Sequence, residues 1–201
     1  MNLVLVLRAE LVCLIILLYL TFVSRTYRMG KDVRIFNQIL FFAIIHVVMD
    51  MVTVYTVNSL GDTLLNKIAH VIFYLSAIMY SYEMCIYTLN LSRPQQMDRK
   101  KRLLALLPAM IYLVLLFTPL LPIQYEQLNG TKASTGPAAT VGFVIAFMYF
   151  AVAIGSIFTH WRKVGRHFKR VMLPMLGIYA GVGILIGVFG GVNAIRNYLK
   201  V

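Results

Sequence analysis

The sequence contains few acidic residues, few cysteines and none of the patterns that mark an enzyme active site. Only 7 residues are Asp or Glu, against 19 Lys or Arg. No glycine-rich phosphate loop, Ser/His/Asp set or cofactor fingerprint is present. The two cysteines, Cys13 and Cys85, lie in apolar segments at different expected depths, which does not favour a disulfide. We therefore expect a chain that is not an enzyme and holds no cofactor.

Long apolar runs dominate what is present. Hydrophobic residues make up 60% of the 201 positions, in runs of about twenty, the length at which a helix spans a bilayer core. The alternation that barrel strands require is absent. The sequence predicts an all-α polytopic transmembrane bundle, organised as a single domain over 1–201. Its six expected spans are about 3–24, 35–57, 65–91, 103–121, 138–159 and 171–194.

The basic residues cluster in alternate connectors between these spans. The connectors after the first, third and fifth spans hold four, five and five lysines or arginines, and five lie elsewhere. The positive-inside rule then places these connectors in the cytoplasm and the N-terminus outside. The first run lacks a basic leader and a cleavage site, so we expect a retained span in a plasma-membrane protein. The charge indicates topology and not nucleic-acid binding, and the expected partners are the lipid bilayer and a small ligand.

Five ionisable side chains fall in the outer half of the first three expected spans: Arg8, Glu10, His46, Asp50 and His70. His46 and Asp50 are four residues apart and therefore share one helix face. A charged group in hydrocarbon costs several kcal/mol unless it is paired or neutralised, so such residues usually face a bundle interior. We expect a pocket for a small ligand or proton, or alternatively a salt-bridge network that joins three helices. Metal-ligand spacing is weak, and no metal is predicted.

Glu83 lies alone in the inner half of the third span, near Tyr80 and other tyrosines. It is expected to be protonated, or to bond a tyrosine hydroxyl or one of Asn37 and Gln38. Glu83 and Tyr80 are candidates for transmission towards the cytoplasm, and a satisfied packing contact is the plain alternative.

The sixth span carries glycines at four-residue spacing, which permits close helix approach. We expect packing within the bundle, with a homodimer as the alternative. The glycines concerned are Gly177, Gly181, Gly183, Gly187 and Gly191.

Several short patterns along nearly the whole chain together resemble the N-terminal membrane sensor of clostridial GGDEF-type diguanylate cyclases. They include Leu-Arg-Ala-Glu ending at Glu10, His46-Val-Val-Met-Asp50, the run from His70 and the external Gly136-Pro. The sequence is similar also to seven-helix sensors of histidine kinases. The resemblance implies a seventh helix after Val201 that leads to a cytoplasmic output domain, although an external tail is equally consistent.

We therefore expect a membrane sensor that signals to an output domain outside this chain, a diguanylate cyclase or kinase by resemblance. The alternative is a small proton-coupled transporter, although the inverted repeats and broken helices that favour one are not seen. A third hypothesis, an intramembrane metal hydrolase, requires more histidines than the outer half provides.

Overall fold

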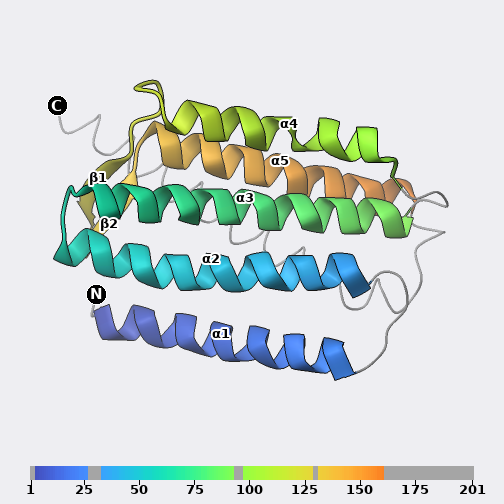
Figure 1. Cartoon of the computed structure of the whole chain (residues 1–201), viewed down its shortest axis with the longest axis horizontal. Coiled ribbons are helices and arrows are strands. Elements are labelled where there is room, and N and C mark those ends of the chain that lie inside the picture. The colour runs from blue at the N-terminus through green and yellow to red at the C-terminus, as the bar shows by residue number, and fades with distance from the viewer. Residues whose placement is uncertain (1–2, 27–32, 93–96, 129–130, 161–201) are drawn as a thin grey trace.

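The computed structural model describes residues 3–26, 33–92, 97–128 and 131–160, which form five helices and a two-stranded hairpin. The helices are α1 (Leu3–Thr26), α2 (Val33–Ser59), α3 (Leu64–Ser92), α4 (Arg99–Leu116) and α5 (Pro137–Thr159). They lie side by side, with α1 at one edge, then α2 and α3, and with α4 and α5 beyond (Figure 1). The hairpin, β1 (Gln124–Leu128) and β2 (Thr131–Thr135), lies at the end where α2 stops and α3 starts (Figure 1).

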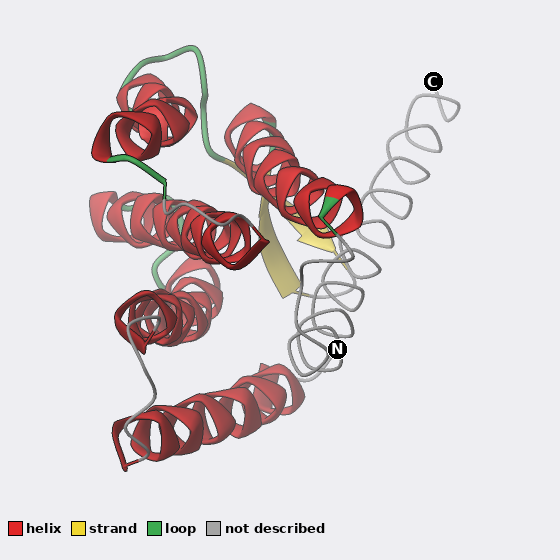
Figure 2. Cartoon of the chain, turned by 90° about the vertical axis from the view of Figure 1, so that its right-hand side faces the viewer, coloured by secondary structure: helices red, strands yellow, loops and turns green. Residues whose placement is uncertain are grey.

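Helix α3 is the buried centre of this arrangement. Figure 2 shows α3 between α2 on one side and α4 and α5 on the other, whereas α1 contacts α2. Ile78 and Ile86 are fully buried on α3. Buried hydroxyls on the same helix are satisfied locally, because Ser81 and Thr88 donate to the carbonyls four residues earlier at 2.9 and 2.8 Å. An apolar helix can thus carry polar side chains into the core without leaving them unbonded.

Tyrosine hydroxyls tie α4 to its neighbours. Tyr112 of α4 donates to the Ala138 carbonyl of α5 at 2.7 Å, and Tyr149 of α5 donates to the Ala105 carbonyl of α4 at 2.7 Å. These two bonds run in opposite directions between the helices. They hold α4 beside α5 with aromatic side chains, which supply both apolar area and a polar tip.

The hairpin caps the end of the bundle and is tied to three helices. Lys132 N donates to the Asn58 side-chain oxygen at 3.1 Å, and the Tyr74 hydroxyl donates to Ser134 at 2.9 Å. Gly136 then leads directly into α5 with a φ of +91°, which disfavours other residues. A Cβ at Gly136 would also lie 2.9 Å from the Gln124 side chain. Glycine is therefore required where the hairpin meets α5.

Four of the expected spans, 3–24, 35–57, 65–91 and 138–159, agree closely with the bounds of α1, α2, α3 and α5. The fourth was placed wrongly, since α4 begins at Arg99 and ends at Leu116 instead of spanning 103–121. The basic residues 99–102 form the first turn of the helix, so it starts earlier than expected. Pro119 disfavours a helical conformation in the residue before it, so the helix also ends earlier than expected. The connector after α4, for which no strands were predicted, forms the hairpin.

Three of the described helices contain segments long and apolar enough to cross a membrane. These segments are Ile35–Ser59, Leu64–Asn90 and Pro137–Thr159. The apolar part of α1, Glu10–Phe22, is shorter. The expected sixth span and its glycines Gly177, Gly181, Gly183, Gly187 and Gly191 lie outside the described residues.

Candidate functional site

The contact between α1 and α2 brings together two of the predicted site residues. The carboxyl groups of Glu10 on α1 and Asp50 on α2 lie close enough to interact electrostatically. A carboxylate can only accept, so a bond between two carboxyl groups requires that one of them keeps its proton. The second oxygen of Glu10 is buried and makes no hydrogen bond. This pair is therefore a candidate for a site that holds a proton between two helices.

His46, one turn before Asp50 on α2, points to α3. Its ring stacks on Phe73 with centroids 4.8 Å apart, and its Nδ1 lies 3.3 Å from the Ser76 hydroxyl. Ser76 donates its own proton to the Phe73 carbonyl at 2.7 Å. Because that hydroxyl has a single proton, Nδ1 of His46 must be the donor towards Ser76. His46 thus joins α2 to α3.

His70 is 2% exposed and is held within its own helix and by the hairpin. Its Nδ1 donates to the Asn66 carbonyl at 2.8 Å, and its ring meets Tyr125 edge to face with centroids 5.2 Å apart. Asn66, itself fully buried, accepts from Thr56 at 2.9 Å and donates to the Gly61 carbonyl at 2.8 Å. His70 therefore belongs to a hydrogen-bonded network at the turn between α2 and α3.

The predicted five-residue pocket thus divides into separate contacts. Glu10 and Asp50 meet, while the histidines bond Ser76 and Asn66, and the side chain of Arg8 lies outside the described residues. Within the described part of the chain, no three His, Cys, Asp or Glu side chains gather as metal ligands.

The predicted transmission residues lie on the buried face of α3. Glu83 is 3.9 Å from Arg102 of α4, a separation that fits an ion pair but exceeds a hydrogen bond. From the sequence, Glu83 was expected to be protonated or to bond a tyrosine, Asn37 or Gln38. Arg102 was not predicted as its partner, because the basic run was assigned to a connector. Tyr80 packs on Phe150 of α5 with ring centroids 6.4 Å apart.

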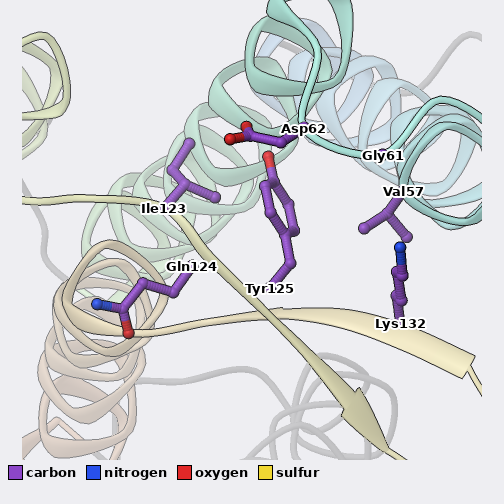
Figure 3. Close-up of a pocket in the computed structure, with 7 residues that line it drawn as sticks. All are labelled: Val57, Gly61, Asp62, Ile123, Gln124, Tyr125 and Lys132. Carbon is purple, nitrogen blue, oxygen red and sulfur yellow. The ribbon is translucent and has the colours of Figure 1, made fainter.

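A cavity of about 610 Å³ opens beneath the hairpin and contains none of the predicted pocket residues. Figure 3 shows the Asp62 carboxylate beside the Tyr125 hydroxyl, with the Lys132 amino group across the space. The Tyr125 hydroxyl is buried and makes no hydrogen bond. Burial, together with the charge of Asp62, raises the pKa of Tyr125 to about 12, so this phenol stays a hydrogen-bond donor at neutral pH.

Sequence reasoning missed Ser76, Asn66 and Tyr125. Asn66 precedes His70 by four residues, and this helical spacing was a usable signal for a partner. Ser76 and Tyr125 are reached only through packing of other elements, and no local pattern indicates them.

Comparisons of the chain with family models, with curated proteins and with solved structures find no match in any of the three.

Proposed function

We propose that this protein is a membrane-embedded sensory module in which the Glu10–Asp50 contact responds to a proton. The observation that carries the proposal is that these two carboxyl groups are neighbours on two different helices, with one Glu10 oxygen buried and without a hydrogen-bond partner. While one proton is shared, the pair attracts and holds α1 against α2. Loss of that proton leaves two anions in contact. At an effective dielectric constant of about 20, two unit charges about 4 Å apart repel by about 4 kcal/mol.

A repulsion of this size is comparable with the few kcal/mol that separate two packings of a switching protein. Helix α1 is the element that would move, because it contacts α2 and exposes most of its apolar side chains. His46 and Ser76 hold α2 on α3, so α2 stays with the bundle. Proton loss would therefore change the position of α1 relative to α2 and α3, which stay in place.

The orientation of the chain in the membrane is part of the same proposal. With six spans and the basic connectors in the cytoplasm, the N-terminus and the Glu10–Asp50 pair lie towards the outside. By resemblance, the signal would pass through a further helix to a cytoplasmic diguanylate cyclase or kinase domain. A homodimer stays a prediction of the glycine pattern.

The test is a distance measurement between spin labels at Cys13 of α1 and at an introduced cysteine, Phe147→Cys, on α5. Both positions are exposed, and Cys85→Ala removes the second native thiol. In lipid nanodiscs, we expect the distance distribution to shift or broaden between about pH 4 and about pH 9, a range that covers carboxyl titration. The variant Glu10→Gln/Asp50→Asn stays neutral at every pH and should retain the low-pH distribution throughout.

Glu126→Gln provides the matched control, because it removes an exposed carboxyl group from the hairpin. This variant should keep the full pH response. A native protein without any shift, or a double variant that still shifts, would exclude the proposal. Uptake assays in proteoliposomes test the transporter alternative: substrate accumulation driven by a proton gradient would favour a transporter over a sensor.

A further inference from the structure

A second cavity, of about 690 Å³, lies at the end of the bundle opposite the hairpin. The start of α2 contributes Ile35 and Gln38, and the start of α4 contributes Arg99 and Arg102, with Met97 just before it. The lining thus combines two guanidinium groups, one amide and two apolar side chains. No carboxylate is among the lining residues.

The polar side of this cavity suits an anion. Guanidinium groups bind phosphate through planar, charge-assisted pairs of hydrogen bonds, and a glutamine amide adds a further donor. Arg102 has one acidic neighbour, Glu83, at 3.9 Å, which is too long for a hydrogen bond. Arg99 is exposed at the first turn of α4. The first turn of α4 carries four basic residues, 99–102, against the buried Glu83 and the N-cap residue Asp98, so the surroundings of the cavity are net positive.

The start of α4 is fixed in place by side chains of α3. Met97 N donates to the Asn90 side-chain oxygen at 2.9 Å, and the Tyr82 hydroxyl donates to the Arg102 carbonyl at 3.0 Å. These bonds set the direction in which α4 leaves the end of α3. The backbone that carries both arginines is therefore preorganised, which lowers the cost of ordering a site.

We propose that this cavity binds a phosphate group. Ile35 and Met97 form an apolar wall beside the arginines, which fits a phosphate that carries an apolar substituent, such as the headgroup of an anionic lipid. Basic pockets between helices at a membrane surface recognise lipid headgroups in this way. The proposal uses no residue of the Glu10–Asp50 pair, so each proposal can fail without the other.

The experiment measures binding of fluorescent phosphatidylglycerol to the purified full chain in neutral detergent, with fluorescent phosphatidylcholine as the zwitterionic comparison. Arg99→Gln and Arg102→Gln should each weaken phosphatidylglycerol binding about tenfold, as expected for loss of a charge-assisted bond. Lys100→Gln and Lys101→Gln remove the same charge from the same helical turn but do not line the cavity. They should change binding less than about twofold.

An excess of inorganic phosphate, with chloride at matched ionic strength, distinguishes the sources of the phosphate group. Displacement of the lipid by phosphate, sensitive to Arg99→Gln, supports a site that accepts soluble phosphates. Lack of displacement together with the arginine dependence supports a lipid headgroup. Equal weakening by the arginine and lysine variants, or equally tight phosphatidylcholine binding, would overturn the proposal.

Arg102→Gln leaves Glu83 buried without its charge partner, so its folding is checked by circular dichroism. Arg99→Gln retains the Glu83–Arg102 pair and keeps the test decisive if the other variant does not fold. The combined variant Glu83→Gln/Arg102→Gln removes both charges and should also lose phosphatidylglycerol binding.

Discussion

Helices α1 and α3 are both long and apolar, yet they are held in opposite ways. On α3, apolar side chains such as Ile78 and polar ones such as Asn66 are equally buried, and the Asn66 amide is hydrogen-bonded. On α1, large apolar side chains are exposed, among them Ile15 at 65% and Phe22 at 68%. The comparison indicates that α3 is the frame of the bundle and that the described part of α1 packs mainly along α2.

The largest expected difference between the two helices is the cost of the same truncation. Ile78→Ala on α3 should lower the free energy of unfolding by about 3 kcal/mol, because it leaves a cavity in a packed core. Ile15→Ala on α1 should cost less than about 0.5 kcal/mol, because its side chain is exposed. Denaturant unfolding in mixed micelles, followed by circular dichroism, measures both. Equal costs would show that α1 is packed as firmly as α3.

A smaller effect is expected from removing a buried amide. Asn66→Ala should lower the free energy of unfolding by about 2 kcal/mol, since Thr56 and the Gly61 carbonyl lose their buried partner. Asn58→Ala removes an exposed side chain that also makes two hydrogen bonds, and it should cost about 0.5 kcal/mol. The same unfolding assay compares them. A cost at Asn58 as large as that at Asn66 would contradict the assignment of α3 as the frame.

The mildest test leaves the chain unchanged and compares its two cysteines. Cys13 is exposed on α1, and Cys85 is 3% exposed on α3. Because access limits thiol modification, a small maleimide in detergent should label Cys13 at least about ten times faster than Cys85. Mass spectrometry of the digested protein assigns each label to its cysteine. Similar labelling rates would indicate that α3 opens as readily as α1.

The sequence predicted the helices well because membrane-length apolar segments are a local signal. Predicted limits such as 65–91 lie within a residue of the observed α3, Leu64–Ser92. The prediction failed at α4, where charged residues and Pro119 set the limits, and at the hairpin, whose strands carry no strong alternation. Local composition does not report pairing between segments that meet only in the folded chain.

The position of each ionisable residue along its helix also follows from the sequence, because a helix rises by about 1.5 Å per residue. This position does not determine which neighbouring helix a side chain faces. His46 and Asp50 are one turn apart on α2, yet the histidine reaches Ser76 of α3 and the carboxyl group reaches Glu10 of α1. The sequence by itself thus determined the apolar helices and the level of their polar groups. Only tertiary packing decided their partners, because it sets the rotation of each helix about its axis and the neighbours it meets.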